Sequence, residues 1–131
     1  MSDVHELKAI RGAITVEADE RELVIAAAKE LTETLLAENG LSADDVVSAI
    51  YTSTVDLTSA FPAMGAREAG LVNTALLCAQ EIPVPGSQPR CIRVLVHAYM
   101  QAGRPVRHVY LKDAVNLRPD WASAVTGGEK S

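Results

Sequence analysis

The stretch Cys91-Ile92-Arg93-Val94-Leu95-Val96 decides how this chain folds, because it has the strongest strand character of any segment. Aliphatic and β-branched residues at this density predict a strand with at least one buried face. Arg93 interrupts the apolar run, and a guanidinium keeps its charge and is rarely buried without a partner. Arg93 must therefore reach solvent, pair with a carboxylate or bind an anionic ligand. The strand alone leaves the ion pair and the ligand equally open.

The composition predicts one domain with an aliphatic core. Of the 131 residues, 48% are hydrophobic and 4% are aromatic, and the formal net charge is -5. An acidic chain argues against a nucleic-acid-binding protein, which usually presents a basic surface. No apolar stretch approaches the roughly 20 residues of a membrane span, and the first residues lack the features of a signal peptide. We therefore expect a cytoplasmic protein with one domain over residues 1–131, a core at about 8–121 and a flexible tail at about 122–131.

Charge is distributed unevenly along the chain. Residues 1–60 carry 12 acidic and 4 basic side chains, whereas residues 61–131 carry 5 acidic and 8 basic ones. An arginine-rich second half in an acidic protein indicates a local anion-binding site rather than a general surface for polyanions. Six of those eight bases are arginines: Arg67, Arg90, Arg93, Arg104, Arg107 and Arg118.

The hydrophobic pattern predicts an α/β (α+β) fold with a five-stranded sheet, one long helix and two short helices. The long helix should begin after an N-cap at Asp19, present a stripe that includes Leu23 and Leu31, and end near Asn39 with Gly40 at C′. One long helix can cover only part of such a sheet, so we expect a symmetric oligomer. The expected strands are 8–16, 46–52, 74–82, 91–99 and 107–111; the short helices begin at 61–62 and 112, and 42–45 forms a capped turn.

The familiar catalytic motifs are missing from the sequence. It contains no GxGxxG, GxxxxGK[ST], HExxH or GxSxG pattern. Cys78 and Cys91 form no CxxC pair and are expected to be free thiols. The three histidines are scattered along the chain at positions 5, 97 and 108. We therefore expect no metal, no nucleotide cofactor and no nucleophilic catalysis.

A few polar residues remain within apolar sequence: Arg11, Glu81, Arg93, Arg107 and Tyr110. Arg93 and Glu81 are expected on adjacent strands joined by a short loop, where they would form a structural ion pair or share a ligand. Arg107 and Tyr110 should point to opposite faces of one strand, with Arg107 structural or solvated. Phe61, the only phenylalanine, would by default belong to the core.

Several of these residues fall within a set of motifs that resembles a known family. The ordered motifs are Arg11-Gly12-Ala13, Asp56-Leu57 with Phe61-Pro62-Ala63, Cys78-Ala79-Gln80-Glu81, Cys91-Ile92-Arg93-Val94, Arg107-His108-Val109-Tyr110-Leu111 and Leu117-Arg118-Pro119-Asp120. The set resembles the monofunctional, AroH-class chorismate mutases over about residues 8–121. The resemblance implies a Bacillus chorismate mutase-like homotrimeric pseudo-α/β barrel with an active site at each subunit interface. It also implies an isomerase of the shikimate pathway that rearranges chorismate to prephenate without cofactor, metal or covalent intermediate.

The resemblance also implies a role for each matching residue. Arg93 would donate to the ether oxygen of the substrate, and Glu81 would accept from its ring hydroxyl. Arg11 and Tyr110 would hold a carboxylate. The backbone of Leu77, Cys78, Ala79, Gln80 and Glu81 would line the substrate ring. The adjacent subunit would supply Phe61, Ala63 and Arg67, and the C-terminal segment with Leu117 and Arg118 would cover the site.

The sequence departs from the family pattern at a few positions, and two other interpretations remain. Met64 stands where a related sequence has lysine, and Leu76 and Leu77 stand where it has valine and threonine. The alternatives are a differently catalytic or non-catalytic trimer similar to the imine deaminases, and a scaffold that only binds a dicarboxylate. The full polar set favours the mutase: Arg11, Glu81, Arg93 and Tyr110.

Overall fold

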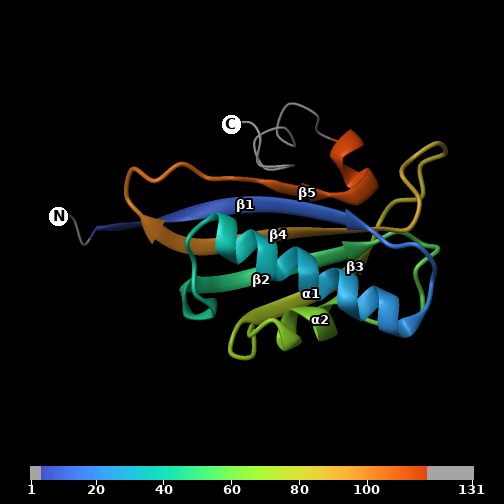
Figure 1. The fold of residues 1–131 in the computed structure, drawn as a ribbon, viewed down its shortest axis with the longest axis horizontal. Coiled ribbons are helices and arrows are strands. Elements are labelled where there is room, and N and C mark those ends of the chain that lie inside the picture. The colour runs from blue at the N-terminus through green and yellow to red at the C-terminus, as the bar shows by residue number, and fades with distance from the viewer. Residues whose placement is uncertain (1–3, 118–131) are drawn as a thin grey trace.

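A computed structural model describes residues 4–117, which form a five-stranded mixed sheet with two α-helices on one face (Figure 1). The sheet has the order β3-β2-β4-β1-β5. The inner pairs β2–β4 and β4–β1 are antiparallel, and the outer pairs β2–β3 and β1–β5 are parallel. In chain order the elements are β1 (His5–Thr15), α1 (Arg21–Glu38), the 3₁₀ turn η1 (Ala43–Asp45), β2 (Val46–Ser53), α2 (Pro62–Glu68), β3 (Ala75–Gln80), β4 (Cys91–Gln101), β5 (Val109–Leu111) and the 3₁₀ turn η2 (Lys112–Asn116).

The five predicted strands and the long helix are confirmed, but the last strand is shorter than expected. Arg107 precedes β5, and its backbone N–H and C=O bond the side chain of buried Asn39 at 2.8 and 2.9 Å. The prediction that Arg107 and Tyr110 lie on opposite faces of one strand is therefore wrong. Arg107 itself is exposed. No helix in the described part of the chain is long and apolar enough to cross a membrane.

Helix α1 begins one residue later than the capping pattern suggested. Glu20 occupies the N-cap without a side-chain hydrogen bond. The Asp19 carboxylate instead accepts the backbone N–H groups of Thr58 and Ser59, both at 3.0 Å, and so ties down the segment before α2. The predicted C′ position is confirmed, because Gly40 has a φ of +62° after the helix ends.

Helix α1 packs closely on the middle of the sheet. Its buried residues include Val24, Leu31 and Leu35. The prediction that Leu23 belongs to the buried stripe is wrong, because Leu23 is 38% exposed. The helix turns about 100° per residue, so a stripe of strict four-residue spacing drifts away from the core-facing side. Gly12 permits the close approach, because a Cβ there would lie 3.0 Å from Leu31 Cδ1.

The two faces of the sheet differ in what covers them. Along β4, Ile92, Val94 and Val96 are buried on the side of α1, so the alternate residues point to the other side. Neither α1 nor α2 covers that second side, which we call the open face (Figure 1). Its exposed large apolar residues are Leu7 (54%), Ile50 (37%), Leu77 (61%) and Tyr99 (49%). Two cross-strand rows of the open face run Leu77–Ile50–Leu95–Arg11 and Ala79–Thr52–Arg93–Ala13–Tyr110.

Candidate active site

Arg93 and Glu81 form an ion pair at the open face. Arg93 Nε lies 3.4 Å from Glu81 Oε2, and the two side chains are 37% and 20% exposed. The predicted pairing is confirmed, but the prediction of adjacent strands is wrong, because β2 lies between β3 and β4. Glu81 directly follows β3 and its backbone N–H bonds the Ser53 carbonyl of β2 at 2.8 Å, so the long side chains of Glu81 and Arg93 meet above β2. A partly exposed pair at this distance typically stabilises a fold by about 1 kcal/mol or less.

The Arg93 guanidinium is only partly engaged by its neighbours. Nε is buried and makes no hydrogen bond to any described residue. Glu81 Oε2 instead accepts a hydrogen bond from Thr52 Oγ1. The exposed part of the Arg93 side chain lies at a cavity of about 320 Å³. The other residues that line this cavity are Thr54, Glu81, Ile82, Val84, Ser87 and Gln88.

Tyr110 and Arg11 lie on the same face as Arg93. Tyr110 is in the same cross-strand row, with the small Ala13 between them, so the two backbones are about 10 Å apart. Arg11 lies two residues before Ala13 along β1 and therefore also points to the open face. Three of the predicted polar residues thus lie on one face of the sheet.

His108 is a residue of this region that the sequence reasoning missed. The backbone N–H of Arg11 donates to His108 Nδ1 at 3.0 Å, which requires that Nδ1 be unprotonated. The imidazole extends the pairing of β1 beyond the start of β5 at Val109. His108 lies inside the predicted strand at 107–111, and a solitary histidine carries no recognisable spacing, so no signal in the sequence predicts this contact.

A small apolar cluster packs beside this polar row. Tyr110 is 2% exposed and lies with Ala13, Cys91 and Ala114, and Leu117 packs against them. The predicted lid residue Leu117 is therefore placed next to the predicted carboxylate-binding tyrosine. Arg118 and the tail at about 122–131 lie outside the described residues.

The buried Cys91 thiol is unsuited to act as a nucleophile. Burial raises its pKa to about 11, although the nearby Arg93 cation acts to lower it. A thiol with this pKa is protonated at neutral pH, and the thiolate is the reactive form. Both cysteines are free, as predicted. Within residues 4–117, no group of three or more His, Cys, Asp or Glu residues could hold a metal ion.

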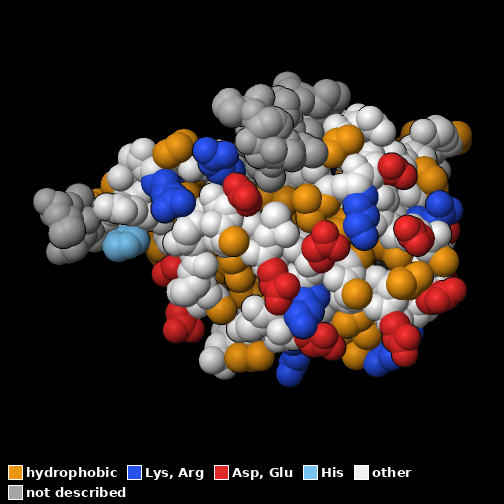
Figure 2. Space-filling model, viewed as in Figure 1, with side chains coloured by type: hydrophobic (Ala, Val, Ile, Leu, Met, Phe, Trp, Pro, Cys, Tyr) orange, Lys and Arg blue, Asp and Glu red, His pale blue; other side chains and the backbone are white. Residues whose placement is uncertain are grey.

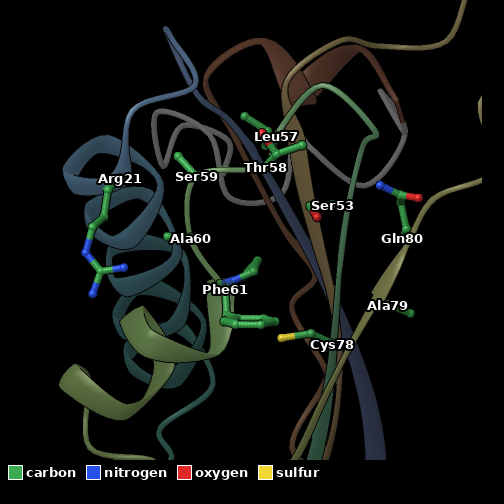
Figure 3. A pocket seen from close by; sticks show the side chains of 11 residues that line it. Arg21, Ser53, Leu57, Thr58, Ser59, Ala60, Phe61, Cys78, Ala79 and Gln80 are labelled. Carbon is green, nitrogen blue, oxygen red and sulfur yellow. The ribbon is translucent and has the colours of Figure 1, made fainter.

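A second cavity, of about 390 Å³, lies on the helix side of the sheet. Figure 3 shows the Phe61 ring and the Cys78 thiol pointing toward one another across it. Phe61 is 69% exposed, so the prediction that it belongs to the core is wrong. Phe61 is the N-cap of α2, and Pro62 at the first helical position is buried in its place. Other predicted residues at this cavity are Ala79 and Gln80.

Helix α2 holds its predicted site residues away from Arg93. A Cβ at Gly65 would lie 2.4 Å from the Ile25 carbonyl oxygen, so α2 packs directly on the α1 backbone. Phe61, Ala63 and Arg67 belong to α2 and its cap, and so lie on the helix side. On the helix-side surface, acidic and basic side chains are interspersed (Figure 2). One chain therefore separates the predicted residues into two groups, one on each side of the sheet.

Comparison with known proteins identifies the family. A family model described as chorismate mutase type I matches residues 7–121. This chain belongs to that family. It is 51% identical over 122 residues to a chorismate mutase AroH of Thermus thermophilus, covering 90% of this chain and 98% of the relative. It is 39% identical over 116 residues to the chorismate mutase AroH of Bacillus subtilis, covering 87% and 91%.

A solved chorismate mutase structure resembles the fold described above. The chorismate mutase of Clostridium thermocellum superposes with a TM-score of 0.78 at 44% sequence identity, covering 82% of this chain and 96% of that chain. The predicted fold class, a five-stranded mixed sheet of the chorismate mutase type, is thereby confirmed.

Proposed function

We propose that this protein catalyses the Claisen rearrangement of chorismate to prephenate, for phenylalanine and tyrosine biosynthesis. The observation that carries the proposal is the partly exposed Arg93 guanidinium beside Glu81, in a chain of the chorismate mutase type I family. The rearrangement breaks an ether C–O bond and forms a C–C bond within one molecule. It needs no nucleophile and no proton transfer, which agrees with a site built from arginines, a carboxylate and a tyrosine.

Arg93 is proposed as the main catalytic residue. As the ether bond breaks, partial negative charge accumulates on the oxygen, and a fixed cation there stabilises the transition state more than the ground state. One such preorganised donor is typically worth about 3–4 kcal/mol. Lysine would retain the charge but lose the planar array of donors.

The neighbouring residues are proposed to bind and orient the substrate. Glu81 accepts a hydrogen bond from the ring hydroxyl, and Arg11 and Tyr110 hold a carboxylate. The backbone of Leu77, Cys78, Ala79 and Gln80 lines the ring. The position of Arg93 and Tyr110 in one cross-strand row, on either side of Ala13, supports roles in a single site. Holding the reactive conformer lowers the entropic part of the barrier.

The complete site is proposed to form between the subunits of a homotrimer. The apolar row of the open face supports an assembly that covers it, because Leu77 and Ile50 are otherwise exposed. The separation of the two residue groups within one chain supports a shared site. Phe61, Ala63 and Arg67 of one copy would meet Arg93 of the next copy. Leu117 and Arg118 would then cover the bound substrate.

The proposed activity is tested by following the ultraviolet absorbance of chorismate in the presence of the purified protein. The expected result is loss of chorismate far above the uncatalysed rate, with no effect of a chelator. A rate equal to the uncatalysed one would exclude the mutase function. Light scattering on the same sample should give the mass of a trimer, and a monomer that turns over chorismate would exclude the shared site.

A further inference from the structure

Thr52 lies directly beneath the Arg93–Glu81 pair. It stands on the open face of β2, and its register partners are Arg93 on β4 and Ala79 on β3. Its Oγ1 donates a hydrogen bond to Glu81 Oε2, the same oxygen that faces Arg93 Nε. The backbone N–H of Glu81 also bonds β2, through the Ser53 carbonyl at 2.8 Å. Strand β2 therefore anchors both the backbone and the carboxylate of Glu81.

The hydroxyl of Thr52 and the guanidinium of Arg93 face the same carboxylate oxygen, Glu81 Oε2. Arginine–carboxylate pairs commonly close into short, often bidentate hydrogen bonds of about 2.7–2.9 Å. Here Arg93 Nε lies 3.4 Å from Oε2 and makes no hydrogen bond to a described residue. The Thr52 hydroxyl is the group that donates a hydrogen bond to this oxygen. Arg93 is thus attracted to Glu81 without its Nε–H being bonded to it.

We propose that Thr52 is a positioning residue for the rearrangement. Its hydroxyl holds Glu81 so that the carboxylate does not close onto Arg93. Arg93 then presents its N–H groups to the ether oxygen, and Glu81 keeps Oε1 for the substrate hydroxyl. This inference rests on the proposed chorismate mutase function and adds a residue that does not touch the reacting atoms.

A purely structural role for Thr52 makes the opposite prediction for two conservative variants. Threonine is favoured in strands for its branched shape, which Thr52→Val keeps and Thr52→Ser loses. A structural role therefore makes the serine variant the more damaged one. A positioning role depends on the hydroxyl, which Thr52→Ser keeps and Thr52→Val loses.

The test measures kcat and KM for chorismate in both variants and in Ser48→Ala, which removes a hydroxyl from the same strand and face. Thr52→Val should lower kcat about tenfold or more, as expected for loss of a hydrogen bond to a charged group, with KM changed less than about twofold. Thr52→Ser and Ser48→Ala should stay within about twofold of the wild type. The Thr52→Val protein should unfold at nearly the wild-type temperature.

Combination with Glu81→Gln shows whether Thr52 acts through Glu81. In that background, Thr52→Val should cause little further loss of kcat, because the carboxylate it positions is gone. A Thr52→Val enzyme with wild-type kcat, a serine variant as slow as the valine variant, or a fully additive double variant would each overturn the inference alone. A wild-type protein without turnover would instead overturn the proposed function, and this inference with it.

Discussion

The two faces of this sheet come from alternate residues of the same strands, yet they differ in almost every physical property. Toward α1, Ile10, Ile14 and Ile92 are fully buried, and Gly12 lets the helix approach the sheet. Toward the open face, Arg93 stays partly exposed and Leu77 is 61% exposed. The side toward α1 contributes apolar burial, at roughly 25 cal/mol per Å². The open face leaves polar and apolar groups available for other molecules.

Successive side chains of a strand point to opposite faces, so residues that stabilise this fold alternate with residues of the proposed site. On β4, Ile92 belongs to the core, and the next residue, Arg93, is the proposed catalytic cation. Changes on the α1 side should therefore alter unfolding and leave turnover per folded subunit intact. Changes on the open face should alter assembly and turnover and leave the fold of each chain intact.

The largest effect is expected from a charge placed in the apolar row of the open face. Ile50→Asp puts a carboxylate between Leu77 and Leu95, where trimer formation would bury it without a partner. We expect the proposed trimer not to form and turnover to be lost, as measured by light scattering and chorismate absorbance. Leu23→Asp is the matched control, because Leu23 is equally exposed, at 38% against 37%, but lies on α1. If Ile50→Asp still formed a trimer, the open face would not be the interface between subunits.

A smaller effect, on stability alone, is expected on the α1 side. Ile92→Ala removes most of a fully buried side chain and should lower the free energy of unfolding by about 2–5 kcal/mol. Urea denaturation measures this, with Ile82→Ala as the control because Ile82 is 80% exposed. Turnover per folded subunit of Ile92→Ala should stay near that of the wild type. Equal destabilisation by the two variants would contradict the assignment of the core.

The smallest effect is a pH dependence that originates in the core. Burial raises the pKa of Tyr51 to about 12, against an ordinary value near 10, although its hydrogen bond with Thr32 acts to lower it. The folded state therefore holds the phenolic proton more tightly than the unfolded state. This stabilisation is fully present below pH 10 and is lost as the pH rises toward 12, by about 2–3 kcal/mol.

Tyr51→Phe should flatten that alkaline loss of stability. At neutral pH the variant should lose only about 0.5–1.5 kcal/mol, because the Thr32 hydroxyl keeps its bond to the Ala28 carbonyl. Denaturation at pH 9 and pH 11.5 compares the two proteins. Part of the slope should remain, since the pKa of Cys91 is also raised, to about 11. Identical slopes in the wild type and the variant would contradict this assignment.

Local patterns in the sequence predicted the elements of the fold well. The strands, the long helix with Gly40 at C′ and the short helix begun by Pro62 follow from periodicity, capping and proline chemistry. The capping pattern wrongly predicts Asp19 as the N-cap, because the real partners of its carboxylate, Thr58 and Ser59, are 39 and 40 residues away. A carboxylate that bonds distant backbone groups has the same local sequence as one that caps a helix.

The candidate site was predictable only in part. Arg93 and Glu81 stood out as charges within apolar sequence, and they do pair. The insertion of β2 between their strands is a long-range feature that no local pattern encodes. Thr52 was overlooked for the same reason, because a threonine in a strand is ordinary until the strand order places it under the pair. The predicted roles of the site residues stay predictions.

The most direct test of the difference between the two faces is kcat for chorismate in Arg93→Ala. If Arg93 faces the ether oxygen, kcat should fall by about 10²- to 10³-fold. The proposed trimer and the free energy of unfolding should change little, because the Arg93–Glu81 pair is partly exposed and Arg93 Nε makes no hydrogen bond to a described residue. An Arg93→Ala enzyme that keeps kcat within about threefold of the wild type, as an intact trimer, would contradict the account.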